Sequence, residues 1–216
     1  MEGIRGKKSL EIDETEMLRL LTGYGGTLID LGTGDGRFAR RMAESEPDCF
    51  VIGVDTCREN LRAASRSACP NLLFLIADAR ALPRALDGLA ARLTLNFPWG
   101  SLLEGLLEGH PDLLAGLLRV IRPGGVIELR LNSGALAEIG HSLEEGVGRA
   151  RRVLAEHGFR SGPEVIMEPS QLRSFPSTWA RRLAVGRDPR AVLLTLERPG
   201  AGFAAARAEL VPTLQV

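Results

Sequence analysis

Apolar residues follow two alternating spacings along the first 120 residues of the chain. Short, almost continuous apolar runs predict buried strands, and segments whose apolar residues recur every three or four positions predict amphipathic helices. The runs lie at residues 27–31, 49–54, 72–76 and 93–97, and the helical segments at residues 35–43, 58–65 and 111–120. Because buried strands that alternate with helices form a parallel sheet covered on both faces, this order predicts an α/β fold.

The same two spacings extend the fold at both ends. Residues 3–10 are short, basic and compatible with a strand, and an amphipathic helix begins at Asp13. Later come a strand at 126–131, a helix at 143–157 and two strands near 164–167 and 191–196. The last two strands are expected to form an antiparallel edge. We therefore expect a seven-stranded, mostly parallel sheet with helices on both faces and a short N-terminal β extension.

The domain organisation follows from where these patterns stop. We expect a single domain over residues 1–198, in which residues 1–12 form a basic extension. Residues 199–216 are Ala-rich and loosely patterned, so we expect a mobile tail or a marginal helix and assign it no function. With 27 basic and 27 acidic side chains the formal net charge of the chain is zero. Contact with a nucleic acid would therefore need a local basic face, since such proteins usually have a basic excess.

The composition argues against several classes of protein. We find no apolar run long enough to span a membrane and no signal peptide, so we expect a cytoplasmic protein. The three cysteines, Cys49, Cys57 and Cys69, are odd in number and lack a metal spacing, which indicates reduced thiols. The three histidines are scattered, so the sequence predicts no metal site.

A glycine-rich loop carries the first chemical signal. The sequence Asp30-Leu31-Gly32-Thr33-Gly34-Asp35-Gly36 follows the first predicted parallel strand and opens a helix. Such glycines permit a tight turn and let a cofactor approach the backbone closely. The next strand is followed by Asp55, about 20 residues on, where a carboxylate can accept hydrogen bonds from a ribose diol. Together these features predict a nucleoside cofactor.

The loop resembles the first motif of class I S-adenosylmethionine-dependent methyltransferases. A nicotinamide loop would read G-x-G-x-x-G, and the carboxylate of Asp35 would be poorly placed beside its pyrophosphate. Ala77-Asp78-Ala79 and Arg122-Pro123-Gly124-Gly125 resemble two further segments of that fold. The resemblance implies S-adenosylmethionine as cofactor, with Asp30 and Gly32 near its methionyl part, Asp55 at the ribose, and Asp78 and Ala79 near adenine. Gly34 and Asn96 are further candidates for cofactor binding. The alternative for Asp78 is a helix cap.

Both tryptophans of the chain lie in distinctive local sequences. Trp99 follows the fourth strand in Asn96-Phe97-Pro98-Trp99-Gly100-Ser101-Leu102-Leu103, and Trp179 lies in Ser177-Thr178-Trp179-Ala180-Arg181-Arg182-Leu183. Two flat rings beside a nucleoside loop suggest a pocket that holds a planar base. The alternative is that both rings are core residues.

Over nearly the whole chain, and most specifically in the two Trp segments, the sequence resembles the aminoglycoside-resistance 16S rRNA methyltransferases of the kanamycin–apramycin group, which modify N1 of adenine-1408. The resemblance implies that Trp99 and Trp179 sandwich a flipped adenine and that Ser101 and Ser177 order cofactor or pocket loops. It implies 16S rRNA within the 30S ribosomal subunit as partner, and a monomer. Basic residues at the N-terminus and late in the chain are the candidates for RNA contact: Arg5, Lys7, Lys8, Arg181, Arg182 and Arg187.

That chemistry is consistent with the residues available. A base must leave its helix to be methylated, and stacking on aromatic faces returns roughly 1–3 kcal/mol per base. N1 of neutral adenine already has a lone pair, so the attack needs no general base. Methylation leaves a positive charge on the ring, which two indoles stabilise through cation–π attraction.

Two positions depart from the pattern of the resistance group. Asn96 lies where an apolar residue is expected, and Arg80 where an acidic one is expected. Asn96 keeps two other classes open: the DNA and protein amino methylases with Asn-Pro-Pro-Tyr-like motifs, which bind an exocyclic amine, and the transfer-RNA guanine-N7 methyltransferases. The second class has a basic run where this chain has Gly100-Ser101-Leu102-Leu103. A small-molecule methyltransferase and a non-catalytic cofactor- or ribosome-binding module are further alternatives.

Overall fold

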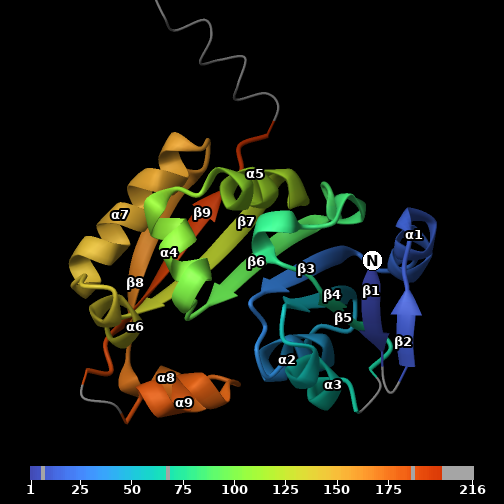
Figure 1. Ribbon diagram of the computed structural model, residues 1–216, viewed down its shortest axis with the longest axis horizontal. Helices are drawn as coiled ribbons and strands as arrows, with labels where there is room; N and C mark the ends of the chain where they lie inside the picture. The colour runs from blue at the N-terminus through green and yellow to red at the C-terminus, as the bar shows by residue number, and fades with distance from the viewer. Residues whose placement is uncertain (6–7, 67–68, 186–187, 201–216) are drawn as a thin grey trace, which may run out of the picture.

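One sheet runs through the part of the chain that the computed structural model describes, residues 1–5, 8–66, 69–185 and 188–200. Among these residues it has nine strands in the order β2-β1-β5-β4-β3-β6-β7-β9-β8 (Figure 1). The parallel strands are β3 (Gly26–Leu31), β4 (Cys49–Asp55), β5 (Leu72–Ile76), β6 (Ala90–Asn96) and β7 (Ile121–Asn132). The antiparallel edge is formed by β9 (Ala191–Glu197) and β8 (Arg160–Met167). The predicted α/β class, parallel core and antiparallel edge are confirmed.

The N-terminal extension is a hairpin that joins the sheet, so the sheet has two more strands than the seven predicted. β1 (Glu2–Arg5) pairs antiparallel with both β2 (Lys8–Glu11) and β5. The side chain of Ile4 is 2% exposed and packs in the cluster that contains Phe74 of β5. The carboxylate of Glu2 pairs with both terminal nitrogens of Arg58, which ties the hairpin to the helix that follows β4.

Helices cover both faces of the sheet because neighbouring residues of a strand point to opposite faces. On β3, Ile29 belongs to the buried cluster that also holds residues of α1 (Glu14–Leu21), α4 (Gly100–Glu108), α5 (Pro111–Val120), α6 (Ser133–Glu138) and α7 (Leu143–Glu156). Leu28 of the same strand packs with α2 (Arg37–Ser45) and α3 (Arg58–Ala64) on the other face. Figure 1 shows the two sets on either side of the sheet.

A third apolar cluster joins the end of β6 to the connection between β8 and β9. This connection contains α8 (Pro169–Ser174) and α9 (Thr178–Leu183), and the buried Leu172 and Ala180 pack with Phe97. Residues 169–174, 178–183, 100–108 and 133–138 were not predicted as helices, and neither were the short 3-10 turns η1 (Ala79–Ala81) and η2 (Arg84–Leu86). Most of these segments are too short for a helical periodicity to emerge.

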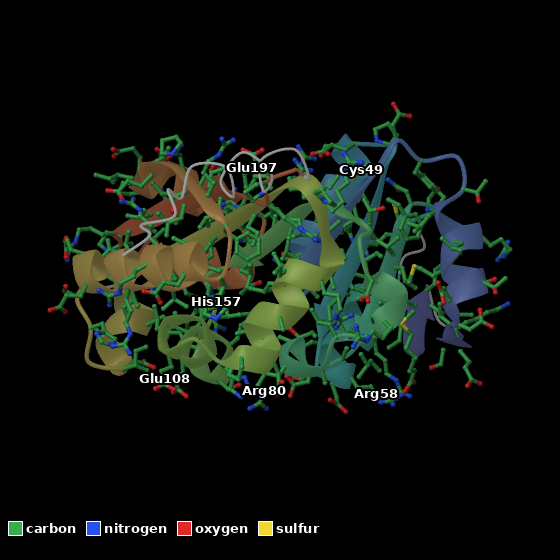
Figure 2. All side chains as sticks on the ribbon, turned by 90° about the horizontal axis from the view of Figure 1, so that it is seen from above. Cys49, Arg58, Arg80, Glu108, His157 and Glu197 are labelled. Atoms are coloured by element: carbon green, nitrogen blue, oxygen red, sulfur yellow. The ribbon has the colours of Figure 1, made fainter. Side chains whose placement is uncertain are left out.

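The strand order creates a crevice at the carboxyl ends of the parallel strands. The chain proceeds from β3 outward through β4 and β5, then returns to β6 on the other side of β3. In α/β sheets such a reversal leaves a ligand crevice at the carboxyl ends of the strands. Figure 2 shows Arg58 and Arg80, which follow β4 and β5, along one edge of the molecule, with Cys49 at the start of β4 along the opposite edge.

Three expectations from the sequence concern a membrane span, a metal site and the C-terminal tail. No helix within them is long and apolar enough to cross a bilayer. No group of three or more His, Cys, Asp or Glu side chains in that part of the chain is arranged as metal ligands would be. The predicted tail from residue 201 on, together with Lys7 and Arg187, lies outside the described residues.

Candidate functional site

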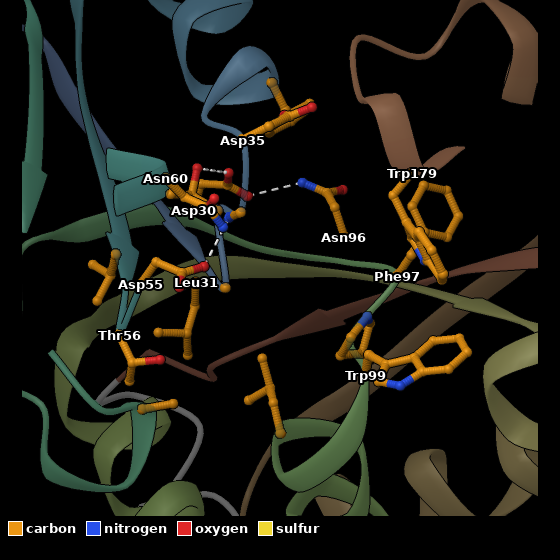
Figure 3. A pocket seen from close by; sticks show the side chains of 18 of the residues that line it. Asp30, Leu31, Asp35, Asp55, Thr56, Asn60, Asn96, Phe97, Trp99 and Trp179 are labelled. Atoms are coloured by element: carbon orange, nitrogen blue, oxygen red, sulfur yellow. Dashed lines mark hydrogen bonds between the residues drawn. The ribbon is translucent and has the colours of Figure 1, made fainter. Parts of the chain in front are cut away.

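A pocket of about 690 Å³ opens at the carboxyl ends of β3, β4, β5 and β6. Its volume is within the usual range of ligand pockets, roughly 300–1,000 Å³. The structure brings together there every residue that the sequence suggests for cofactor or base: Asp30, Gly32, Gly34, Asp55, Asp78, Ala79, Asn96, Trp99, Ser101, Ser177 and Trp179. Figure 3 shows Asp55 and Thr56 at one end of this pocket and the two indoles at the other.

The glycine loop folds back onto the end of β4. The amides of Gly32 and Thr33 donate to the carbonyl of Val54 at 2.9 and 3.0 Å. Gly32 and Gly34 have φ angles of +73° and +54°, which residues with a Cβ rarely adopt. A Cβ on Gly34 would meet no atom within 4 Å, so backbone conformation, and not crowding, calls for glycine at this position. The loop thus exposes backbone to the pocket.

Asp55 supports the loop and still has acceptor capacity. One carboxylate oxygen accepts from the amide of Gly34 at 2.8 Å, and the other accepts from the amide of Cys57 at 2.8 Å. A carboxylate has about four lone-pair sites, so two remain for a ligand hydroxyl pair. This arrangement fits the ribose of a nucleoside.

Asp30 is the buried centre of a polar network between β3, β6 and β7. The residue is 1% exposed, and its carboxylate accepts from the hydroxyls of Thr33 and Thr94 and from the amide nitrogen of Asn96. Burial raises the pKa of Asp30, while these hydrogen bonds oppose the rise. The carbonyl oxygen of Asn96 in turn accepts from Arg130 at 2.9 Å.

This network explains why a polar residue is found at position 96. The Asn96 side chain joins Asp30 to Arg130 and uses both ends of its amide within the protein. The sequence places Asn96 correctly in the pocket but gives no sign of these partners, which lie on two other strands.

Asp78 serves both as a helix cap and as the partner of Arg80. Its carboxylate accepts from the backbone amide of Arg80 at 2.8 Å and pairs with the guanidinium at 3.0 Å. The guanidinium lowers the pKa of Asp78. Both side chains line the pocket beside Ala79. The departure at position 80 therefore places a cation where the related pattern has an acid, and that cation engages Asp78.

The two indoles meet at the far end of the pocket. Phe97 has a φ of +54° and directly follows β6, and two residues later Trp99 lies 40% exposed at the start of α4. The centroid of the Trp99 ring is 5.0 Å from that of Trp179, and the two ring planes are 88° apart. The alternative that both are core residues does not hold for Trp99, which lines a pocket and is exposed.

Ser177 and Ser101 have different environments. The hydroxyl of Ser177 caps α9 by accepting from the amides of Trp179 and Ala180 at 3.2 and 3.5 Å. It thereby holds the start of the helix that carries Trp179. Ser101 lies exposed in the first turn of α4, beside Trp99. The indole nitrogen of Trp179 is buried and has no hydrogen-bond partner in the described structure.

Several pocket residues were missed by sequence reasoning. Asp35, Phe38, Thr56, Asn60 and Thr178 also line the cavity, as does Arg80, which the sequence marked only as a departure from the pattern. Asp35, Thr56 and Asn60 lie within five residues of predicted contacts, so their sequence neighbourhood was the available signal. Thr178 lies beside a predicted residue as well, but its approach to the glycine loop depends on the tertiary fold.

The predicted RNA-contact residues are divided between two regions. Arg182 lines the pocket and Arg181 is exposed on the same short helix, α9. Arg5 lies on β1 and donates to the carbonyl of Pro70, and Lys8 is exposed on β2. β1 and β2 form the other edge of the sheet, so these two residues do not border the pocket.

Comparisons with known proteins point in one direction. A family model described as NpmA, 16S rRNA (adenine(1408)-N(1))-methyltransferase, matches residues 2–198. The chain is 32% identical over 204 residues to the 16S rRNA (adenine(1408)-N(1))-methyltransferase of Streptoalloteichus tenebrarius, covering 87% of this chain and 94% of that one. It is also similar to the solved structure of the 16S rRNA methyltransferase KamB, with a TM-score of 0.82 and 29% identity over 92% of this chain and 100% of that one.

A further solved structure bears on the cofactor. It is a single-residue mutant of the 16S rRNA (adenine(1408)-N(1))-methyltransferase from Catenulisporales acidiphilia, crystallised with its cosubstrate S-adenosylmethionine. This chain is similar to it with a TM-score of 0.81 and 28% identity, over 93% of this chain and 98% of that one.

Proposed function

The chain belongs to the family of 16S rRNA (adenine(1408)-N(1))-methyltransferases, and we propose that its pocket transfers a methyl group from S-adenosylmethionine to N1 of adenine-1408 in the 30S ribosomal subunit. The product would confer resistance to kanamycin and apramycin. The observation that carries the proposal is the meeting of Trp99 and Trp179 at the end of a nucleoside pocket whose other end holds Asp55.

The residues of the pocket fit the cofactor. Asp55 has lone pairs free for ribose hydroxyls, and the loop offers backbone to the methionyl part at Gly34, where even a Cβ would meet no atom within 4 Å. Asp30 lines the cavity at that point, and Ala79 lies where adenine would be received, next to Asp78. When bound, S-adenosylmethionine supplies an electrophilic methyl group. A lone pair already on adenine N1 makes a general base unnecessary. What the chain must do is hold N1 in line with that methyl.

The two indoles supply the base site. Stacking on an aromatic face is worth roughly 1–3 kcal/mol per base, which offsets part of the cost of flipping adenine out of its helix. Their negative ring faces also stabilise the positive charge that methylation places on adenine. Since the two rings lie edge to face at 5.0 Å, one of them must turn before a base can enter between them.

Asn96 favours N1 of adenine over an exocyclic amine as the methyl acceptor. Amino methylases hold the amine with an Asn side chain at this position. Here the carbonyl oxygen of Asn96 accepts from Arg130 and its nitrogen donates to Asp30. The amide is thus held within the protein, and the pocket relies on the indoles to fix the base.

Docking on the ribosomal subunit would use the basic face beside the pocket. Arg181 and Arg182 lie on the helix that carries Trp179 and are exposed. Phosphate contacts from such residues position a protein on RNA without reading its sequence. We place this reaction in the cytoplasm and propose that one copy of the chain is sufficient for it.

A direct test uses purified 30S subunits and labelled S-adenosylmethionine. Primer extension should stop opposite adenine-1408, and subunits with guanine at that position should accept no label. Transfer RNA and protein-free 16S rRNA are assayed beside the 30S subunits as comparison substrates. Labelling of transfer RNA alone, or a stop at another nucleotide of the 30S subunit, would contradict the proposed function.

A further inference from the structure

The helix that carries Trp179 is capped by two different parts of the chain. The first amides of a helix lack partners within it. In α9, the amides of Trp179 and Ala180 donate to the hydroxyl of Ser177, the residue before the helix. The amide of Thr178, the first residue of α9, instead donates to a carboxylate oxygen of Asp35 at 3.0 Å, across 143 positions of sequence. The glycine loop thus completes the cap of α9.

Asp35 connects the starts of two helices. Its second carboxylate oxygen accepts from the amide of Arg37, the first residue of α2, at 3.2 Å. The side-chain nitrogen of Arg37 lies 3.7 Å from the carboxylate. Asp35 directly follows Gly34, whose amide is held by Asp55. A single carboxylate therefore links the cofactor loop, α2 and α9.

A second contact holds the same segment from the other side. The ring of Phe175 stacks on that of Phe38 in α2, with centroids 5.2 Å apart and planes 2° apart. It also meets the ring of Phe97 edge to face at 5.3 Å. The guanidinium of Arg130 lies 5.4 Å from the Phe175 ring and 5.9 Å from the Phe38 ring. Phe175 anchors the connection, and Asp35 fixes the end from which Trp179 projects.

We propose that Asp35 is a positioning residue that couples the cofactor loop to Trp179, so that a ligand in the loop changes how Trp179 lies against Trp99. The coupling passes from Gly34 to Asp35 and through one hydrogen bond to the amide of Thr178. Its value for catalysis rests on the proposed function of Trp179 in holding adenine. The base site would then be completed only when the methyl donor is present.

Single-tryptophan fluorescence tests the coupling without any RNA. The chain has two tryptophans, so Trp99→Phe leaves Trp179 as the reporter. Saturating S-adenosylhomocysteine, with saturation verified by calorimetry, should change the emission of Trp179 in this background. Adding Asp35→Ala should abolish the change although the ligand still binds.

Position 178 offers a matched pair that leaves Asp35 intact. Thr178→Pro removes the donated amide hydrogen at the first position of a helix, where proline is well tolerated. Ser177 before it has φ −144° and ψ 138°, an extended conformation that suits a residue preceding proline. Thr178→Ala keeps the backbone amide and removes the side chain beyond Cβ. The emission change should vanish in Thr178→Pro and persist in Thr178→Ala.

The remaining controls address charge and turnover. Asp48→Ala removes an exposed carboxylate next to Cys49, at the amino end of β4 and away from the pocket, and should retain the full emission change. With Trp99 restored, Asp35→Ala and Thr178→Pro should lower kcat on 30S subunits by about ten- to a hundredfold, the scale expected for a small misplacement of reacting groups. The KM for S-adenosylmethionine should move by less than about threefold, a difference below 1 kcal/mol.

Three results would overturn the coupling. The first is an emission change that persists in both Asp35→Ala and Thr178→Pro. The second is a loss of the emission change in Thr178→Ala as complete as that in Thr178→Pro. The third is the lack of any emission change in the Trp99→Phe parent at saturating ligand. Because the fluorescence measurement contains no RNA, these results are distinct from a failure to methylate adenine-1408, which would count against the proposed function instead.

Discussion

The indoles of Trp99 and Trp179 lie edge to face, with centroids 5.0 Å apart and planes 88° apart. A base held between two parallel rings needs about 3.5 Å of clearance on each side. The pair must therefore open from its perpendicular contact when adenine enters, and the rings protect each other until then. Aromatic contacts of this geometry are worth about 0.5–1.5 kcal/mol, so opening is a modest cost against two stacking contacts.

Trp99→Ala and Trp179→Ala are each expected to lower kcat/KM on 30S subunits by roughly 5- to 150-fold, the equivalent of one lost stacking contact. Filter binding of labelled 30S subunits gives the rate, and calorimetry with S-adenosylhomocysteine should give an affinity close to that of the parent. Phenylalanine at either position should recover part of the rate because it keeps a ring face. A loss of folding stability in step with the loss of rate would favour core residues instead.

Asp55→Ala should weaken S-adenosylhomocysteine binding by roughly 10- to 150-fold, because it removes charged acceptors worth about 1.5–3 kcal/mol. It also releases the amide of Gly34, which Asp55 holds at 2.8 Å. Calorimetry measures the effect directly. Asp48→Ala is the matched control, an exposed aspartate at the amino end of the same strand, β4. Equal affinities for the two variants would mean that the ribose is held elsewhere.

The parts of this site that sequence could predict are the local ones. The glycine loop follows β3, Asp55 ends β4 and Trp99 comes shortly after β6, so a strand pattern and a few neighbouring residues place them in the pocket. The hydrogen bond from Thr178 to Asp35 joins residues 143 positions apart, and no local spacing encodes it. Asn96 is intermediate in this respect, because its place was predictable while its partners on β3 and β7 were not.

The fold shows the same division. Long periodic segments such as α7 were predicted almost to the residue, since their core-facing residues recur over several turns. α4 was missed although its buried Leu103, Leu106 and Leu107 have helical spacing, because it begins directly after Pro98 and Trp99. α9 has only six residues, and part of its cap comes from Asp35, which tertiary structure brings to the start of the helix.

Asn96→Leu should lower the free energy of unfolding by about 1–3 kcal/mol, because it removes one hydrogen bond from each of two charged groups, the carboxylate of Asp30 and the guanidinium of Arg130. Urea denaturation followed by circular dichroism measures this change. The methylated atom, mapped by mass spectrometry of the digested rRNA, should remain N1 of adenine. A variant that keeps its stability but no longer methylates would point to direct contact between Asn96 and the acceptor amine.

The ion pair between Asp188 and Arg190 predicts a pH dependence of stability. Hydrogen bonds from the guanidinium lower the pKa of Asp188 from 3.8 to about 2. A carboxylate whose pKa is depressed by folding stabilises the protein above its unfolded pKa and loses that effect as the pH falls toward its folded pKa. Asp188→Asn should therefore be less stable than the parent from about pH 7 to pH 5, and the difference should shrink below about pH 4.

Urea midpoints at several pH values measure this difference. Arg190→Gln removes the partner and should give the same profile. Because Asp188 is partly exposed, solvent screens the pair and the difference in stability is modest. A gap between parent and Asp188→Asn that stays constant down to about pH 3 would show that the pair does not account for it.

Arg181→Ala and Arg182→Ala test the docking face beside Trp179. Each removed phosphate contact should reduce the slope of log affinity against log salt concentration by about one, whatever the sequence of the RNA. Binding of the variants to 30S subunits over a range of salt concentrations gives the slope.

Arg84, which is exposed on η2 and does not line the pocket, provides the control substitution Arg84→Ala. If the slope falls equally in that control, non-specific charge explains binding. If affinity falls with no change of slope, Arg181 and Arg182 act through the base site, because only the loss of phosphate contacts alters the number of ions released.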